Sequence, residues 1–591
     1  MNQFNQLKRV TQAWFFGRVR SLTRPVGPFQ ASAFASALRA LTPFQAPHAE
    51  VRMEGRKDGR MEGCTYHVSN QESKIANSEE LAITPLPRRG AGGEGNEQHS
   101  PSLKTFLRLA AACLLLFAVS ACEKDFIERT PVYSIDSENY FNSEADYQNA
   151  LIGAYDLLQT SYVNVLLGEI ASDNTLAGGE SATDVIGFQQ VDDMIHTPVN
   201  SNVRDVWNWM FAGVSRASYI LEFQDKTDFA GKEQIIAEAR FLRAYYYFEL
   251  VKWFGPLPLK GDARFSLGDE SSIPRSPVSE VYAAIESDLR LAIDDLAETA
   301  PQVGRVSKGA AQALLGKALL YQEKFAEAAT VLRAVIESGN YRLVDSYGDI
   351  FEMSGENGPG SVFEVQYTDA EGAGFGCLQC SEGNVAVGFN GIRNHTGPVY
   401  DSGFSFNVPT QETYDAFEPG DSRRDVSLLD IDEWAAETGA SFGIGFEHTG
   451  YYNRKYIARK GDSNIGDQNL TNPNNYRAIR YADVLLMAAE AVNRSGGNDE
   501  LARNYLNQVR RRAFGDQDHD VSASGPALLD FILAERRLEL VGEGHRFFDL
   551  VRTGRAAAAI PGFTAGKNEL FPVPFEEIQF AGGNWQQNPG Y

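Results

Sequence analysis

The sequence lacks the features that would place it in several large functional classes. It contains no G-x-x-x-x-G-K-[ST] phosphate loop, no H-E-x-x-H zinc motif and no G-x-S-x-G nucleophile turn. Basic residues are scarce, since 54 Lys and Arg stand against 78 Asp and Glu, for a net charge of −24. An acidic surface repels nucleic acid, so we expect no nucleic-acid partner. We also expect neither a cofactor nor a catalytic centre.

Cysteine is rare as well, with five in 591 residues. Cys377 and Cys380 lie close together in "GFGCLQCSEG" (374–383), with no further cysteine or clustered histidine around them. A zinc site needs more ligands than these two, so no metal is predicted. In an oxidising compartment the pair could form a small local disulfide, and the alternative is two free thiols in a loop.

No apolar run is long enough to span a membrane, but one shorter run has the layout of a secretory signal. In "LKTFLRLAAACLLLFAVSAC" (103–122), Lys104 and Arg108 precede an apolar stretch of 11 residues, from Leu109 to Val119. A membrane helix needs about 18 or more apolar residues, so we predict a signal peptide over 103–121. The ending resembles a bacterial lipobox, which implies cleavage before Cys122 and lipidation of its sulfur. The alternative is a buried amphipathic helix with a chance cysteine.

A signal peptide belongs at the N-terminus, yet 102 residues precede this one. Residues 1–102 show little periodicity and include the polar, Gly-rich tract "RRGAGGEGNEQHS" (88–100). Residues 1–121 hold 15 basic and 9 acidic side chains, so the rest of the chain carries −30. We interpret 1–102 as a misplaced start or a disordered leader, and 122–142 as a lipidated cysteine followed by a tether.

Helical patterns dominate from residue 143 onward. Ser143 is a plausible N-cap for the first helix, and apolar residues recur at helical spacing over 203–223 and 278–296. A long helix is predicted within 231–259, ended by Gly255 and Pro256.

Two stretches have the pattern of paired antiparallel helices. Residues 310–344 match the tetratricopeptide layout, and 481–513 follow the same logic less faithfully. Between them, over about 345–475, helical periodicity fades while Gly, Asn, Ser and aromatics increase, and "SVFEVQY" (361–367) alternates like a strand. We therefore predict a mainly α fold: a tetratricopeptide-like helical-repeat scaffold over 143–591, with a loop-rich insertion that carries short β-strands.

The stretch "ERRLELVGEGHRFFDLVRTG" (535–554) could be mistaken for a catalytic strip. Glu535 and Glu539 lie one helical turn apart, about 6 Å at their bases, so spacing alone does not exclude acid–base chemistry. However, the arginines among these carboxylates would keep them ionised, whereas a general acid needs the opposite environment. We interpret the strip as structural, and expect Arg546 and Asp549 to pair.

Three blocks resemble the signature segments of the RagB/SusD family: "IRYADVLLMAAEAVNR" (479–494), the strip itself, and "LFPVPFEEIQFAGGNWQQNPGY" (570–591). The resemblance extends over 122–591. It implies an outer-membrane surface lipoprotein with a tetratricopeptide-like scaffold, which works with a SusC-like TonB-dependent transporter. Such proteins capture glycans or peptides without cleaving them, and glycan is the leading ligand class. A peptide-binding member of the family and, less favoured, a glycan-cleaving enzyme are the alternatives.

Sugars combine apolar C–H faces with hydroxyl groups, so aromatic rings beside polar side chains are suitable contacts. Two Gly-rich loop regions offer both, one within 169–190 and one within 375–406. The predicted ligand-binding residues are Asp173, Asn174, Phe188, Phe375, Phe389, Asn390, Arg393 and Tyr400.

Overall fold

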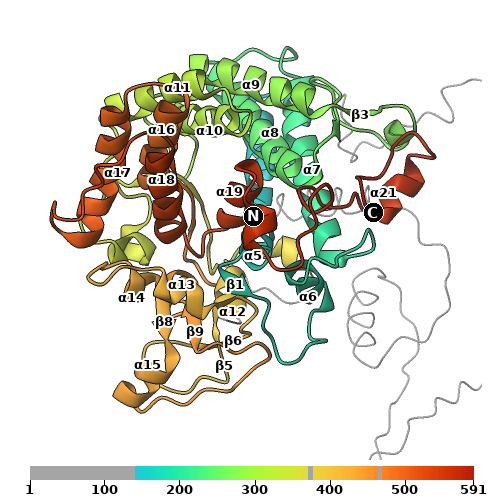
Figure 1. Ribbon diagram of the computed structural model, residues 1–591. Coiled ribbons are helices and arrows are strands. Elements are labelled where there is room, and N and C mark those ends of the chain that lie inside the picture. The colour runs from blue at the N-terminus through green and yellow to red at the C-terminus, as the bar shows by residue number, and fades with distance from the viewer. Residues whose placement is uncertain (1–139, 371–376, 463–466, 468) are drawn as a thin grey trace, which may run out of the picture. The chain divides into compact units, whose positions relative to one another are not determined.

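The computed structural model describes residues 140–370, 377–462, 467 and 469–591 (Figure 1). All of them belong to a compact unit that begins at Glu123. The predicted lipidation site Cys122 and the predicted ligand residue Phe375 lie outside the described residues.

The first half of the unit is a layer of long helices that begin and end where the sequence predicts. Ser143 and Asp146 form a capping box at the start of α4, and Asn200 caps α7 through its side chain. Helix α8 ends because Gly255 adopts a φ of +68° and Pro256 follows. These helices are α4 (Glu144–Asp156), α7 (Ser201–Glu222), α8 (Lys232–Phe254) and α9 (Val278–Asp295).

Both predicted helix pairs are confirmed. In the first pair a three-residue loop joins the helices, and Gly316 lets them approach, since a Cβ there would lie 2.5 Å from Leu332. Helix α11 also packs on α16, so the two pairs stack on each other as helical repeats require. The pairs are α10 (Lys308–Tyr321) with α11 (Phe325–Glu337) and α16 (Tyr481–Arg494) with α17 (Asp499–Phe514), followed by α18 (Gly525–Glu539) and α19 (Arg546–Arg552).

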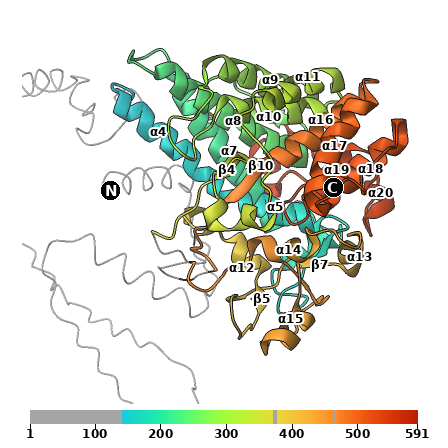
Figure 2. The same cartoon turned by 90° about the vertical axis from the view of Figure 1, so that its left-hand side faces the viewer.

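The predicted loop-rich insertion is built from short elements, and Figures 1 and 2 both show its lower part on one side of the helical body. Its strands pair in twos; β5 and β6 are parallel, and the other pairs among the described residues are antiparallel. The helices of the insertion are α12 (Ala386–Asn390), α13 (Gln411–Asp415), α14 (Arg424–Ser427) and α15 (Ile431–Thr438). Its strands are β4 (Ser361–Val365), β5 (Ile392–Arg393), β6 (Ser402–Gly403), β7 (Val408–Pro409), β8 (Leu428–Asp430) and β9 (Tyr451–Asn453).

Further short elements connect these parts. Strand β4 pairs with β10 immediately before α16, so the insertion begins and ends beside the helical body. The short elements outside the insertion are α5 (Tyr162–Ile170), α6 (Ile186–Asp192), α20 (Ala556–Ala559), α21 (Phe575–Phe580), β1 (Thr175–Leu176), β2 (Leu257–Pro258), β3 (Arg275–Ser276) and β10 (Tyr476–Arg480). The single-turn 3₁₀ helices are η2 (Leu157–Ser161), η3 (Asp269–Ser271), η4 (Gly348–Phe351), η5 (Met353–Gly355), η6 (Leu378–Cys380) and η7 (Arg454–Tyr456).

The hydrophobic core of the described residues has one large part and two small parts, one of which joins the insertion to the strip 535–554 through Phe417, Leu428, Leu538 and Val541. The large part runs through the long helices, and the C-terminal segment closes it: the Phe571 N–H donates to the Trp253 carbonyl at 2.6 Å. The lower part of the insertion has its own small core. We call this region the loop lobe; its core consists of Ile392, Tyr400, Leu429, Ile431, Tyr452 and Ile457.

Candidate functional site

The carboxylates of the strip 535–554 lie in a buried network of ion pairs. Glu535 contacts Arg423 at 2.6 Å and Arg510 at 2.8 Å, and its side chain is fully buried. Arg423 lies just before α14 and Arg510 on α17. The network therefore joins the end of α18 to a helical repeat and to the insertion.

Glu539, the last residue of α18, is the most heavily paired carboxylate of this network. It contacts Arg512 at 2.6 Å, Arg480 at 2.7 Å and Arg423 at 3.0 Å. Burial alone would raise its pKa, but the three guanidinium groups outweigh burial and hold the pKa of Glu539 well below its usual range.

Basic neighbours also lower the pKa of Glu543. Burial opposes its charge, but Arg480 at 2.8 Å and Lys455 at 2.7 Å lower its pKa. A general acid must hold a proton near neutral pH, which Glu539 and Glu543 cannot do in this environment. The buried ion pairs of these carboxylates agree with the interpretation of the strip as a structural element.

One expected pair within the strip is wrong. Arg546 does not pair with Asp549; it binds Asp173 with two contacts, at 2.7 and 2.8 Å. Asp549 instead contacts Arg536 at 2.9 Å and Arg552 at 2.7 Å. The two side chains of α19 therefore serve different neighbours, because Arg546 reaches the loop after α5 while Asp549 contacts an arginine of α18.

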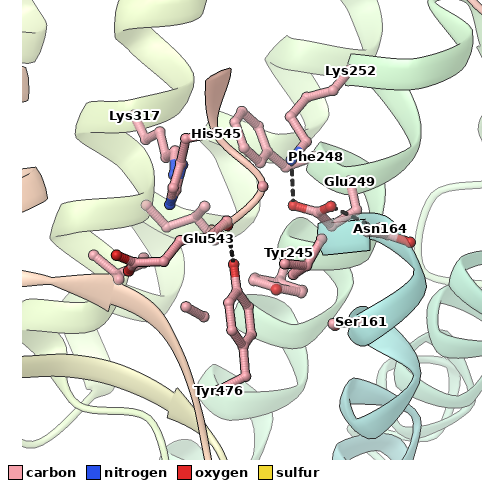
Figure 3. Close-up of a pocket in the computed structure, with 15 residues that line it drawn as sticks. Ser161, Asn164, Tyr245, Phe248, Glu249, Lys252, Lys317, Tyr476, Glu543 and His545 are labelled. Atoms are coloured by element: carbon pink, nitrogen blue, oxygen red, sulfur yellow. Dashed lines mark hydrogen bonds and ion pairs between the residues drawn. The ribbon is translucent and has the colours of Figure 1, made fainter. Parts of the chain in front are cut away.

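Behind the strip lies a small pocket of about 30 Å³ (Figure 3). The Lys317 ammonium approaches His545 Nδ1 at 3.3 Å, and the Asn164 amide donates to Glu249 at 2.7 Å. Burial and the nearby Lys317 charge lower the pKa of His545 to about 3, so the ring is neutral. This volume is about that of one water molecule, which is far too small for a sugar. The strip faces no substrate-sized space here.

The two predicted loop regions converge on one face, which we call the loop face. Strand β1 pairs with β7, and Gly179 forms a β-bridge with Phe446. Asp184, from the first region, lies 3.4 Å from Arg393 of the second. Segments more than 200 residues apart in sequence therefore form one surface.

A segment of alternating glycines and apolar residues, "FGIGF" (442–446), crosses the loop face. A Cβ on Gly443 would lie 2.8 Å from the Asn394 side chain, and one on Gly445 would lie 2.5 Å from the Gly179 carbonyl oxygen. The backbone contact leaves no room for a Cβ at Gly445, whereas at Gly443 the Asn394 side chain would have to move. The apolar side chains alternate with them, and the one between the two glycines, Ile444, is 79% exposed. We call Phe442, Ile444 and Phe446 the apolar ridge.

Comparison with known proteins identifies the chain. Residues 430–566 match the profile described as "SusD family", and 125–320 match "Starch-binding associating with outer membrane". A solved structure, "Laminarin binding SusD-like protein", is 35% identical with a TM-score of 0.70, and the match covers 76% of this chain and 100% of that protein. This chain belongs to the SusD family.

Two further SusD-like proteins are similar to this chain over most of its length. "Surface glycan-binding protein A from Bacteroides thetaiotaomicron in complex with laminarihexaose" is 27% identical, with a TM-score of 0.66, and the match covers 75% of this chain and 99% of that one. "SusD-like protein P2" of Formosa agariphila is 27% identical over 81% of this chain and 98% of its own length. The predicted family and the mainly α, tetratricopeptide-like fold class are confirmed.

Within this SusD-family fold, several predicted ligand residues are held by the protein itself. Asp173 is bound by Arg546, as described above. Asn174 is fully buried and accepts from Arg537 Nε at 2.7 Å. Asn390 is buried and accepts from the Asn407 amide at 2.8 Å. These three side chains position loops, which corrects the expectation that they are open to a ligand.

The predicted aromatic platforms are core residues. Phe188 and Phe389 pack edge to face at 5.8 Å, and both contact Phe406. Tyr400 belongs to the loop-lobe core, and its hydroxyl accepts from Arg454 Nε at 2.7 Å. The three predicted rings within the described residues are buried, so they show no ring face at the surface. The reason is that a Gly-rich loop must bury its few large side chains to be held in place.

Arg393 is the predicted ligand residue that remains at the loop face. It is half-buried, and its guanidinium donates to the Phe404 carbonyl at 2.7 Å and to Ser405 Oγ at 3.1 Å. Beside this face, the buried polar atoms His395 Nε2, Asp401 Oδ2 and Trp434 Nε1 have no hydrogen-bond partner among the described residues. Sequence reasoning missed the apolar ridge, although its glycine alternation is visible in the sequence.

Two other predictions concern cysteine and metal. Cys377 and Cys380 are joined by a disulfide. Within the described part of the chain, no group of three or more His, Cys, Asp or Glu is placed to hold a metal ion. No described helix combines the length and apolar character of a membrane span.

Proposed function

We propose that this SusD-family protein is a cell-surface lipoprotein that captures a glycan and delivers it, uncleaved, to a SusC-like TonB-dependent transporter in the outer membrane. The observation that carries this proposal is the match along the whole length of a laminarin-binding relative at 35% identity. It favours a laminarin-type β-glucan as the ligand. The lipobox-like sequence ending at Cys122 and the family description of outer-membrane association support the lipid anchor and the location.

The loop face is the proposed binding surface. Phe446 is half-buried there, beside the backbone of Gly179, and it belongs to no core cluster of the described residues. A ring in this position can pack against the C–H face of a glucose unit. Arg393 lies beside Gly445, and Asp184 beside Gly179, the bridge partner of Phe446; together they supply a donor and an acceptor for hydroxyl groups.

Non-cleavage is proposed because the carboxylates of the strip are committed to ion pairs. Glu535, Glu539 and Glu543 each contact a basic side chain within 3 Å. Among the described residues, no specific observation favours the glycan-cleaving or the peptide-binding alternative.

Isothermal titration calorimetry with laminarihexaose tests this proposal. We expect saturable binding, and a loss of about tenfold in affinity, or about 1.4 kcal/mol, for Phe446→Ala. Phe531→Ala is the matched control, because Phe531 is an exposed ring on α18, away from the loop face. Chromatography of the same samples should recover the intact hexaose.

The results that would overturn the proposal are distinct. Absence of laminarihexaose binding would exclude the laminarin-type ligand. Equal affinity of wild type and Phe446→Ala would exclude this ring as a contact. Shorter products in the chromatogram would show that the protein is an enzyme after all.

A further inference from the structure

An exposed apolar patch surrounds α21 at the edge of the helical body. Of the 14 large apolar side chains exposed among the described residues, five lie on three short segments: the turn before α7, the loop before η3, and α21 itself. Figure 1 shows α21 at the right-hand edge of the body, with α17 and the loop-lobe helix α15 toward the left. We call these five side chains the α21 patch: Ile195, Val199, Leu267, Phe575 and Phe580.

The three segments are held together as one surface. The Phe575 N–H donates to the Pro198 carbonyl at 2.9 Å, which ties the start of α21 to the turn before α7. Helix α21 also packs on η3, and the Asn584 amide donates to the Ile273 carbonyl at 2.9 Å, just after η3. The apolar side chains of these segments therefore belong to one surface rather than to separate ones.

The buried side of this region fixes the patch in place. Trp585, which follows α21, is 5% exposed, and its Nε1 donates to the Ile273 carbonyl at 2.8 Å. Its ring lies 6.0 Å from that of Trp207 on α7. Phe575 and Phe580 nevertheless remain 46% and 59% exposed. Apolar patches that stay exposed on a well-packed protein mark interaction sites.

Carboxylates accompany the apolar side chains. Glu577 is half-buried in α21, where burial and the neighbouring charges of Glu270 and Glu576 raise its pKa to about 7. Burial also raises the pKa of Asp205, near the start of α7, to about 6. Arg204 lies 3.9 Å from Asp205 and 3.8 Å from Glu576, at the limit of an ion pair. The patch is therefore acidic, and its like charges have no closer cation among the described residues.

Charge decides which partner suits the α21 patch. A second copy of this chain would bring another acidic surface, because residues 122–591 carry a net charge of −30. Anionic lipid head groups would be repelled in the same way. A protein surface with apolar side chains edged by Lys or Arg instead complements both the rings and the carboxylates.

We propose that the α21 patch docks the transporter, against a surface of apolar side chains edged by Lys or Arg. The identity of the partner rests on the proposed function, whereas the apolar and basic character of its surface rests on the patch. Because α21 and α15 lie toward different edges of the molecule, docking here leaves the loop lobe accessible to a glycan (Figure 1).

Site-specific photo-crosslinking of the full chain in outer membranes tests the inference. A benzoylphenylalanine in place of Phe580 should crosslink to peptides of a TonB-dependent transporter, identified by mass spectrometry. The same probe in place of Phe531 is the matched control, because Phe531 is an exposed ring on α18, outside the patch. It should give no such crosslink.

Two substitutions separate the apolar part of the patch from the charged part. Phe580→Ser removes an exposed ring, and Glu576→Lys places a cation where the partner is expected to be basic. Each should reduce the amount of transporter recovered with the lipoprotein after detergent extraction by about fivefold or more. Phe531→Ser and Glu337→Lys are the matched controls and should change nothing, since Glu337 is an exposed carboxylate at the end of α11.

Several results would overturn the inference. Crosslinks from Phe580 to a second copy of this chain or to lipid would name a different occupant. Equal crosslinking from Phe531, or recovery that Phe580→Ser and Glu576→Lys leave unchanged, would show that the transporter docks elsewhere. Failure of the proposed function is a separate result, in which the wild-type protein recovers no transporter or binds no laminarihexaose. Laminarihexaose affinity should stay unchanged in Phe580→Ser, because α21 lies outside the loop face.

Discussion

Arg423 is the residue on which the buried ion-pair network can be tested most directly. Its side chain is fully buried and contacts Asp421 at 2.7 Å, Glu535 at 2.6 Å and Glu539 at 3.0 Å. We consider Arg423→Met, which keeps much of the side-chain volume and removes the charge and every donor.

The expected cost follows from what each carboxylate loses. Glu535 keeps Arg510 and Glu539 keeps Arg480 and Arg512, but Asp421 loses the one basic partner recorded for it among the described residues. Removing one member of a buried ion pair costs about 3–5 kcal/mol, because the other charge is left uncompensated. We expect Arg423→Met to lower the free energy of unfolding by an amount in this range.

Urea denaturation followed by circular dichroism measures this cost, with Arg290→Met as a surface control. Arg290 contacts Glu286 and Glu327 but is about half exposed, so its substitution should cost under about 1 kcal/mol. A cost for Arg423→Met no larger than that of the control would refute the reasoning.

Acid should weaken the contribution of this network. Because the folded-state pKa of Glu539 is lowered, the stability it contributes is present above its ordinary value of 4.5 and is lost as the pH falls below it. The difference between wild type and Arg423→Met should therefore be constant from pH 7 to about 5 and shrink in more acidic buffer.

The remaining predictions concern α5 and the loop face. Burial raises the pKa of Glu169 from 4.5 to about 7, so the stability that Glu169 contributes falls as the pH rises through this window. Between pH 5 and pH 8 the free energy of unfolding of Glu169→Gln should therefore rise by about 2–3 kcal/mol relative to that of wild type. A difference in urea denaturation that does not change with pH would contradict this. Gly168→Ala should lower the free energy of unfolding by about 1–3 kcal/mol in the same assay, because the new Cβ would lie 2.6 Å from the Gly544 carbonyl oxygen. Gly153→Ala is the control: a Cβ there meets nothing within 4 Å, so the free energy of unfolding should rise by up to about 1 kcal/mol. Phe446→Ala should weaken laminarihexaose binding, as described above.

The helical body could be predicted from sequence because its signals are local. Apolar residues at helical spacing, the capping residue Ser143 and the stop at Gly255 all act within a few residues of the helix they define. The structural role of the strip was also readable, because its carboxylates are interspersed with arginines.

The charge partners could not be predicted in the same way. Arg423, Lys455 and Arg480 lie far from the strip in sequence, and only the fold brings them to Glu539 and Glu543. The expected pair of Arg546 with Asp549 failed for this reason, since both residues find partners on other elements.

For the candidate site, the sequence indicated the loop regions but not which of their side chains face outward. The two loops selected by their Gly-rich, aromatic composition, which marks irregular backbone, meet at the loop face. Composition could not say which aromatics face outward. Phe188 and Phe389 are buried, whereas Ile444 of the apolar ridge is exposed between two glycines.

These observations explain why the signature strip carries so much buried charge. The loop lobe has a core of only six residues, and a further small apolar cluster, Phe417 and Leu428 with Leu538 and Val541, packs the insertion against the strip. Lys455, at the edge of the lobe, adds charged contacts to the strip, with Glu543 at 2.7 Å and the Glu539 carbonyl at 3.0 Å. Charged hydrogen bonds are directional, so they set the register of the lobe on the helical body in a way that apolar contacts do not. The strip that looks catalytic thus holds the loop face in position.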